Sequence, residues 1–238
     1  NWPNDNNREI KWYKNNNFGS YKSYHVMNSY SDYFGGYWHD EDFGFGHFGD
    51  FDEKPGKKLW IWGLAEEGMI WEDLMTDTDG QYIEFQAGKL FNQAANSSSK
   101  TPFKHKEFVP HDADVMNEIW FPLKETGGMV AVSEFAVLNV VEKEGKQNIV
   151  LSALQAINDD LYIYENGELS YTQKIKLSPL EIFETTINTT ENIKIFAQIL
   201  DEVCCFWNRS IQYNWGYWRC SDSNVETSLE TKRVMKPI

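Results

Sequence analysis

Hydrophobic and polar residues alternate along most of the chain with the period of two that is typical of β-strands. Sustained helical periodicity is almost absent, and a short helix over 66–74 is the one exception that we predict. The alternation predicts strands over 21–27, 32–39, 43–49, 58–63, 81–90 and 115–123. The first half of the chain is therefore predicted to be built almost entirely from β-sheet.

The second half of the chain begins with an apolar run over 129–141 and continues with shorter, less aromatic strands. Two hairpin turns are predicted at 143–146 and 165–168, and the second contains the Asn-Gly dipeptide that tight hairpins favour. The change in composition near residue 143 predicts three parts. These are a β-rich portion over 1–143, a smaller sandwich-like β-rich region over 144–220, which is either a second unit or the outer strands of the first, and a linker-like tail over 221–238.

Strand alternation also predicts which side chains share a face of the sheet. Over 81–90, Tyr82, Glu84 and Gln86 point to one side, while the apolar Ile83 and Phe85 point to the other. The apolar pair belongs to a core, so the polar set faces solvent or a cleft.

A second acid lies beside a large aromatic residue, because Glu118 and Trp120 share the non-core face of the strand that follows. Trp60 and Trp62 likewise share one face of theirs. Sugars are recognised by such pairs, in which an aromatic ring covers the apolar face of the sugar and polar groups bind its hydroxyls. A solvated sheet face with incidental aromatic residues is the alternative, and both interpretations stay open.

The densest polar group in the sequence runs from Trp38 through His39 and Asp40 to Asp42, with His47 shortly after it. We interpret His47 as a core histidine that shares a face with neighbouring phenylalanines. The pair of His39 and Asp40 is a candidate for acid–base chemistry, because a nearby carboxylate tunes an imidazole near neutral pH.

Metal binding and nucleophilic catalysis have weaker sequence support. His39, Asp40, Asp42, Asp77 and Asp79 offer donor atoms, but neither a zinc motif nor a calcium loop is present. The segment that contains Asp77 and Asp79 is more often a turn capped by its own aspartate side chains. The three cysteines, at 204, 205 and 220, have no nearby histidine, and the sequence lacks a nucleophile elbow. We expect no cofactor and no metal.

Composition narrows the class of partner. The chain of 238 residues carries 22 Lys and Arg against 36 Asp and Glu, a formal net charge of −14, and 16% of its residues are aromatic. A nucleic acid partner is not expected, because binding phosphates needs a basic face. The aromatic content predicts a folded chain, and the sequence contains no apolar run long enough to predict a membrane span.

Several motifs in a fixed order resemble a bacterial domain family of unassigned function in the galactose mutarotase-like superfamily. They are Tyr-Phe-Gly-Gly-Tyr-Trp-His-Asp at 33–40, Pro-Gly-Lys-Lys-Leu-Trp-Ile-Trp-Gly at 55–63, Trp71, Leu-Met-Thr-Asp-Thr-Asp-Gly-Gln-Tyr-Ile-Glu at 74–84 and Trp-Phe-Pro at 120–122. The resemblance covers residues 1 to 143 and, more loosely, the remainder.

The resemblance implies a β-supersandwich, of which this chain is the C-terminal portion because its Trp2-Pro3 falls midway through the family domain. Members of the family are often followed by tetratricopeptide repeats, which implies such repeats in the parent chain. One departure is that the family's Pro-Tyr-Glu triplet corresponds here to Pro110-His111-Asp112.

The resemblance also implies a concave sheet face that holds a sugar. In mutarotase-like enzymes a carboxylate removes a proton from the anomeric hydroxyl and a histidine supplies one to the ring oxygen. The matching candidates are Glu84 or Glu118 as base and His39 as acid. Substrate binding would then use eight residues: Trp38, Asp40, Trp60, Trp62, Asp79, Tyr82, Gln86 and Trp120.

Three functional hypotheses follow from the sequence. The first is a carbohydrate-active enzyme, either an epimerase or a glycoside hydrolase, in a bacterial saccharide-processing protein that is periplasmic or extracellular rather than cytoplasmic. The second is a carbohydrate-binding domain without catalysis. The third is a structural or protein-interaction module whose aromatic residues are buried in a core. Fold-level analogy supports the substrate class better than the reaction.

Overall fold

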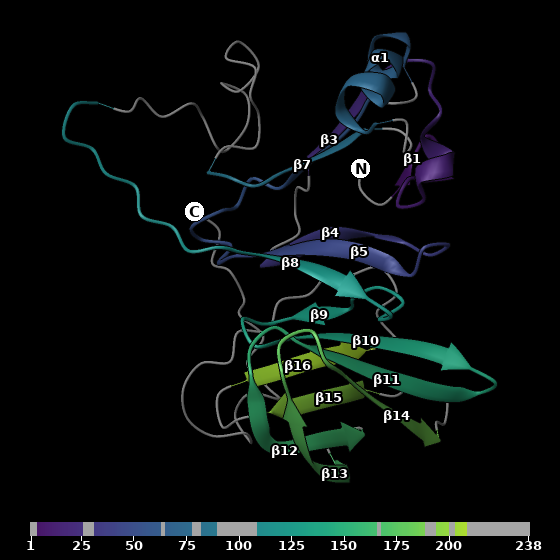
Figure 1. The fold of residues 1–238 in the computed structure, drawn as a ribbon, viewed down its shortest axis with the longest axis vertical. Helices are drawn as coiled ribbons and strands as arrows, with labels where there is room; N and C mark the ends of the chain where they lie inside the picture. Colours follow the sequence, from purple (N-terminus) through teal and green to yellow (C-terminus); the bar gives the residue numbers. More distant parts are fainter. Residues whose placement is uncertain are drawn as a thin grey trace. The chain divides into compact units, whose positions relative to one another are not determined.

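The computed structural model describes residues 4–25, 31–62, 65–77, 82–89, 109–165, 168–188, 194–199 and 203–208 (Figure 1). Within these ranges, the chain consists of antiparallel strands with one α-helix and one 3-10 helix. The all-β, sandwich-like fold predicted from the alternation is therefore confirmed.

The elements of the first half are β1 (Asn4–Asp5), β2 (Arg8–Glu9), η1 (Tyr13–Asn16), β3 (Lys22–His25), β4 (Tyr33–Trp38), β5 (Phe43–Phe48), β6 (Lys58–Ile61), α1 (Glu66–Met75), β7 (Ile83–Gln86) and β8 (Ile119–Lys124). The elements of the second half are β9 (Ala131–Val132), β10 (Ala136–Lys143), β11 (Lys146–Ala153), β12 (Ile157–Glu165), β13 (Glu168–Leu177), β14 (Ile182–Asn188), β15 (Lys194–Ile199) and β16 (Val203–Asn208).

The chain forms two compact units, each described here by itself. Unit 1 comprises Asn1–Phe34 and Gly49–Glu118, and unit 2 comprises Gly35–Phe48 and Ile119–Ile238. The division that composition predicts at residue 143 falls at the end of β10 and stays a prediction.

Unit 1 is organised around the three-stranded sheet β3-β6-β7. One face of this sheet packs on a small core formed by Ile10, Tyr24 and Ile61, with Tyr13 of η1 and Leu59 against it. Trp60 lies opposite Glu84 in the pairing of β6 with β7, so the aromatic and acidic positions share the other face. The β3-β6-β7 sheet thus has one face packed on an apolar core and one face rich in aromatic and charged residues.

The predicted helix is confirmed as α1. Glu66 and Glu67 occupy its first turn, where carboxylates interact favourably with the helix dipole. The indole of Trp71 donates a hydrogen bond to the carbonyl oxygen of Glu67 at 2.9 Å. Within the helix only Gly68 is buried, so α1 lies at the surface of the unit.

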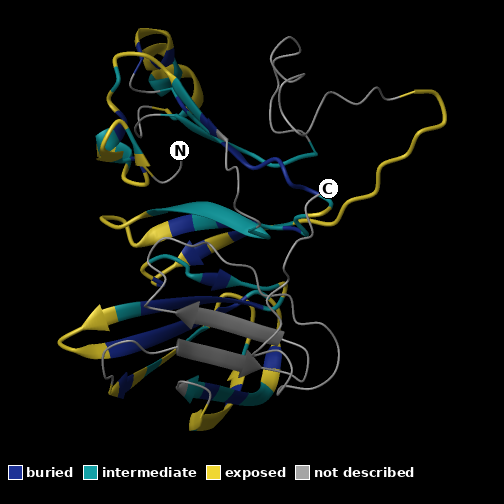
Figure 2. Ribbon diagram, turned by 180° about the vertical axis from the view of Figure 1, so that it is seen from behind, coloured by how far each residue is buried: buried dark blue, intermediate teal, exposed yellow. Residues whose placement is uncertain are grey.

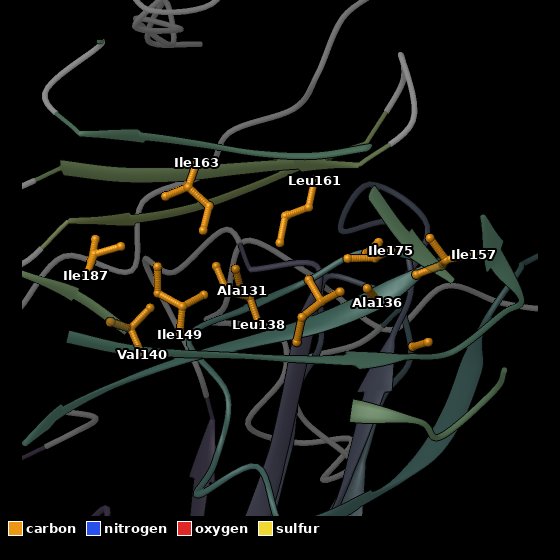
Figure 3. Packing of buried hydrophobic residues seen from close by; sticks show 12 residues of the cluster. Ala131, Ala136, Leu138, Val140, Ile149, Ile157, Leu161, Ile163, Ile175 and Ile187 are labelled. Carbon is orange, nitrogen blue, oxygen red and sulfur yellow. The ribbon is translucent and has the colours of Figure 1, made fainter. Parts of the chain in front are cut away.

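Unit 2 contains a β-sandwich of two four-stranded sheets, β14-β11-β10-β9 and β13-β12-β15-β16. Aliphatic side chains fill the space between the sheets, as Figure 3 shows for Leu138, Ile149, Leu161 and Ile163. These side chains are fully buried, whereas the hairpin tip between β10 and β11 is exposed (Figure 2). The sandwich is held mainly by burial of apolar surface.

A third sheet, β4-β5-β8, packs on the outer face of β10 through Phe121, Leu123 and Val137. Because β10 is buried on both of its faces, its sequence is nearly continuously apolar rather than alternating. Gly46 allows this packing, since a Cβ atom at that position would overlap the ring of Phe121.

Several predicted boundaries differ from the observed ones. The strand predicted over 115–123 begins only at Ile119, and Val115 is exposed. The apolar run over 129–141 divides into β9 and β10, because the hydroxyl of Ser133 accepts hydrogen bonds from the backbone of Phe135 and Ala136 and forms a turn. Both predicted hairpins are confirmed by the pairings of β10 with β11 and of β12 with β13, while residues 166 and 167 of the second turn lie outside the described residues.

Candidate functional site

The most concentrated group of predicted site residues lies on one face of the β6–β7 pair in unit 1. Trp60 and Trp62 come from β6 and the position after it, and Tyr82, Glu84 and Gln86 come from β7 and the residue before it. All five are partly buried. The period of two places them together, although β6 and β7 are more than twenty residues apart in sequence.

The aromatic rings on this face stack on one another. The centroids of Trp60 and Trp62 are 5.5 Å apart with an angle of 11° between the ring planes, and Tyr21 stacks on Trp62 at 4.9 Å. Trp71 of α1 lies 6.1 Å from Trp62 and stacks on Tyr82 at 5.6 Å. These separations are those of offset stacked rings, so part of each ring face is already covered by a neighbour.

The carboxylate of Glu84 is the polar centre of the face. It accepts hydrogen bonds from the indole nitrogen of Trp62, at 3.2 Å, and from the side-chain amide of Gln86. Burial raises the pKa of Tyr82, and the charge of Glu84 raises it further. Burial lowers the pKa of Lys58, while Glu84 acts in the opposite direction.

The indole nitrogen of Trp60 is also notable. It is buried and has no hydrogen-bond partner among the residues that the structure describes. Buried N–H donors are normally satisfied, because leaving one without an acceptor costs about 1–3 kcal/mol. A hydroxyl or water oxygen reaching this nitrogen would remove that cost.

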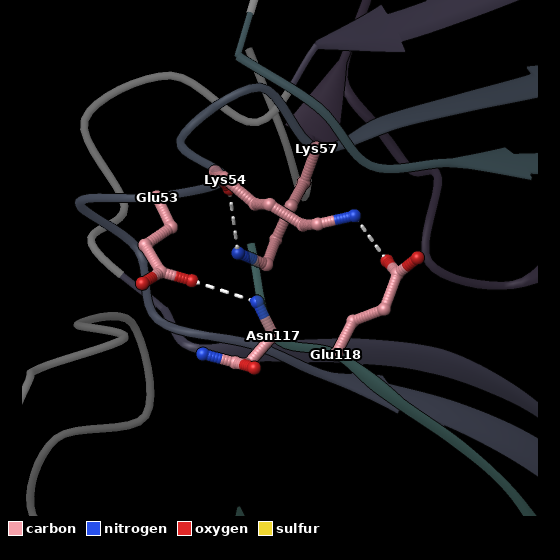
Figure 4. Close-up of polar contacts among 5 residues, drawn as sticks. All are labelled: Glu53, Lys54, Lys57, Asn117 and Glu118. Atoms are coloured by element: carbon pink, nitrogen blue, oxygen red, sulfur yellow. Dashed lines mark hydrogen bonds and ion pairs between the residues drawn. The ribbon is translucent and has the colours of Figure 1, made fainter. Parts of the chain in front are cut away.

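Glu118, the second predicted base, directly precedes β8 and is bound by a lysine that the sequence analysis did not single out. The ammonium of Lys54 donates a hydrogen bond to its carboxylate (Figure 4). The backbone N–H of Asn117 donates to the carboxylate of Glu53 at 2.9 Å, so two neighbouring contacts join the same segments.

A different aromatic group lies on one face of the β4-β5-β8 sheet in unit 2. Phe45 contacts Trp38 at 6.0 Å and Trp120 at 6.4 Å between ring centroids. Trp38, Phe43 and Trp120 are 44%, 46% and 49% exposed, so these rings still offer accessible surface. His47 is fully buried against Trp120, as expected of a core histidine.

His39 and Asp40 lie in the exposed turn that joins β4 to β5. The ring of Tyr37 contacts His39 edge-on, with centroids 5.2 Å apart, and its hydroxyl donates to Asp42. Asp42 adopts a φ of 50°, and its carbonyl oxygen accepts a hydrogen bond from Glu125 at 2.9 Å. The polar run at 38–42 is therefore a tight, braced turn.

The sequence-predicted site residues thus occur in both units. The face of β6–β7 brings together Trp60, Trp62, Tyr82, Glu84 and Gln86, and the β4-β5-β8 sheet carries Trp38 and Trp120. Glu84 and Glu118 belong to unit 1 and His39 to unit 2, and their joint catalytic role stays a prediction. Asp79 lies outside the described residues.

Sequence reasoning missed three buried lysines, Lys54, Lys57 and Lys58. The available signal was their spacing: three cations around a Pro-Gly turn, directly before an aromatic strand. Within the described part of the chain, no three His, Cys, Asp or Glu residues gather in an arrangement that would hold a metal ion. The same ranges contain no helix with the length and apolar character needed to cross a bilayer.

Comparison with known protein families assigns the chain to one of them. A family model described as Domain of unknown function (DUF5107) matches residues 1–123. The match includes all of the described part of unit 1 and extends through the β4-β5-β8 sheet to Leu123. It covers more than half of the 238 residues, and the chain belongs to this family.

Proposed function

We propose that this chain is a carbohydrate-recognising domain of a bacterial saccharide-processing protein. The observation that carries the proposal is the β6–β7 face, where partly buried indole rings lie beside Glu84 and Gln86. Aromatic surface with a few fixed polar groups is the composition that sugar sites share.

The chemistry of this face suits a neutral ligand with many hydroxyl groups. The carboxylate of Glu84 accepts hydrogen bonds, the indole nitrogen of Trp60 is a donor without a partner among the described residues, and Gln86 offers both functions. Lys58 is close enough to Glu84 to interact with it electrostatically, so opposite charges lie together on the face. The sequence resemblance to galactose mutarotase-like proteins adds support for the same substrate class.

A catalytic version of this function would use Glu84 or Glu118 as base and His39 as acid, for epimerisation or glycoside cleavage. It requires these side chains to meet around one sugar. It is tested by NMR exchange between the anomers of free hexoses and by release of nitrophenol from nitrophenyl glycosides.

A second candidate function is a non-catalytic structural or protein-interaction module. The stacking of Tyr21, Trp60 and Trp62 favours it, because rings that cover one another resemble an aromatic core more than an open platform. The two candidates differ in whether polar atoms on the face contribute to ligand binding.

The deciding experiment is a screen of the full chain on an array of neutral oligosaccharides. We expect saturable binding that Glu84→Gln weakens at least tenfold, because the amide loses the charge that strengthens hydrogen bonds to hydroxyls. Glu66→Gln is the matched control, since Glu66 is an exposed acid in the same unit. Absence of saturable binding by the folded wild-type chain would contradict the proposal and favour the interaction module.

A further inference from the structure

The segment Lys54-Pro55-Gly56-Lys57-Lys58, called the lysine segment here, places three lysines in the interior of unit 1. Their residues are 4%, 2% and 7% exposed. Lysine is almost never fully buried unless it is paired, because removing an ammonium from water is costly. Each of these ammonium groups is therefore expected to have a specific polar or charged partner inside unit 1.

Lys54 is paired with Glu118. Its ammonium contacts the carboxylate directly, and the Lys54 side chain is almost completely buried while that of Glu118 is 35% exposed. The carboxylate is thus held from the protein side and retains access to solvent. The adjacent bond from the Asn117 N–H to Glu53 fixes the backbone on both sides of the pair (Figure 4).

Lys58 interacts with Glu84. It begins β6, and its pairing with Gln86 puts it on the face that carries Glu84 and Trp60. Burial lowers the pKa of Lys58, and the charge of Glu84 raises it. The N–H of Gly56 donates to the carbonyl oxygen of Gly88 at 2.7 Å, which ties the lysine segment to the chain just after β7.

Lys57 has a different environment. Its ammonium donates to the carbonyl oxygen of Lys54 at 3.2 Å, and its charged neighbours are Asp32, Asp50 and Lys54 itself. Neither of the candidate carboxylates is among them. Lys57 therefore stabilises the shape of the segment. The two outer lysines, Lys54 and Lys58, interact with Glu118 and Glu84, respectively.

We propose that Lys54 and Lys58 are positioning residues of the carbohydrate site, and that the lysine segment orients both Glu118 and Glu84 toward a neutral sugar. This inference rests on the proposed function. Each ammonium lies beside its carboxylate and limits the directions in which that carboxylate points, so both carboxylates accept hydrogen bonds from the sugar hydroxyls. The two acids would then act as a linked pair rather than as independent surface groups.

The test combines affinity with a double-mutant cycle. For the array oligosaccharides that the wild-type chain binds, we expect Lys54→Met and Lys58→Met each to weaken binding at least tenfold. Lys54→Arg should restore most of the affinity, because it keeps the charge. Lys11→Met is the control, since Lys11 forms an exposed ion pair with Glu9 in the same unit.

A positioning role has a signature that a purely structural role lacks. If Lys54 acts only through Glu118, the double variant Lys54→Met/Glu118→Gln should bind as weakly as Glu118→Gln alone. The double variant also removes both charges of the pair, so it does not leave the buried Lys54 ammonium without its carboxylate, as Glu118→Gln alone does. Further loss of affinity in the double variant, or affinities of both methionine variants within twofold of wild type, would overturn the inference.

A readout without ligand separates this inference from the proposed function. Glu84→Gln should lower the pKa of Lys58, followed by NMR of the lysine side chains, because Glu84 raises that pKa in the wild type. If the wild-type chain binds no glycan in the screen, both the proposed function and this inference are wrong. Binding by the wild type together with an unchanged Lys58 pKa in Glu84→Gln would overturn this inference alone.

Discussion

The two units differ in the kind of side chains that form their interiors. Unit 2 buries a continuous aliphatic cluster between sheets, with Leu138, Leu151 and Leu161 fully inaccessible. Unit 1 has a small core around Ile10 and Ile61, and it buries charged and aromatic side chains as well.

The difference indicates how each unit is stabilised. Aliphatic burial depends on shape and volume and is insensitive to pH, whereas buried ions depend on every partner remaining charged. Natural proteins place such costly polar groups where a function needs them. We therefore expect unit 1 to respond to charge and unit 2 to respond to volume, and the following predictions test that contrast.

The largest expected effect is in the sandwich. Leu138→Ala should destabilise unit 2 by about 2–5 kcal/mol, because it removes apolar contacts and leaves a cavity. Urea unfolding, with hydrogen exchange of β10 and β11 peptides to assign the unit, measures the change. Leu169→Ala on exposed β13 is the control and should change stability by less than about 0.5 kcal/mol. Equal losses for the two variants would contradict a volume-dependent core.

The next effect is a pH dependence in unit 1. Burial lowers the pKa of Lys57 from 10.5 to about 8. The unfolded chain therefore holds more protons between pH 8 and 10.5, and stability should rise with pH across that window by about 3 kcal/mol at most. Lys57→Met should flatten this rise, because it removes the titrating ammonium.

The measurement for Lys57 is best made from pH 7.5 to 9.5. Tyr13 and Tyr24 have pKa values raised to about 12 by burial, so their ionisation in the unfolded chain lowers stability above pH 10. Hydrogen exchange of β6 peptides reports on unit 1. A wild-type stability that is flat over this range would show that Lys57 titrates as an exposed lysine.

A smaller effect is expected at the third sheet. Gly46→Ala should cost about 1–3 kcal/mol, because its methyl group would overlap the ring of Phe121. Gly88→Ala is the matched control, since no atom lies within 4 Å of its Cβ position. Thermal unfolding of the two variants tests the packing, and a neutral Gly46→Ala would mean that the sheet adjusts freely.

The smallest effect concerns a surface ion pair. Lys124 and Glu125 are separated by 3.3 Å, and both side chains are mostly exposed. Lys124→Met should leave the unfolding midpoint nearly unchanged, because water screens such pairs. If Lys124→Met lowers the unfolding midpoint as much as Lys54→Met does, exposed and buried ion pairs contribute equally to stability, and the expected difference between them is wrong.

The period of two was sufficient to predict the strands and the shared face of Trp60, Trp62 and Glu84, because alternation is a local property of a strand. It also predicted the two hairpins, whose turns have local sequence signals. The predicted start of β8 was wrong, because Val115 has the composition of a strand residue but no partner strand to pair with in the described sheets.

The lysines could not be found in this way. Lysine in a turn normally points to water, and what draws Lys54 inward is a carboxylate 64 residues further along the chain. Likewise, the stacking of Trp71 on Tyr82 depends on where α1 lies, and no periodicity encodes that position. The burial of Lys54 and the stacking of Trp71 depend on partners that are distant in the sequence, so they can be recognised only once the fold is known.

The edge of the sandwich has a further consequence for the behaviour of the protein in solution. In the sheet order β13-β12-β15-β16, the ten-residue strand β13 pairs on one side only within the part of the chain that the structure describes. A long unpaired strand edge is a template for aggregation with other chains. Lys174 and Lys176 are exposed on either side of the buried Ile175, and repulsion between such charges in two approaching copies opposes edge-to-edge pairing.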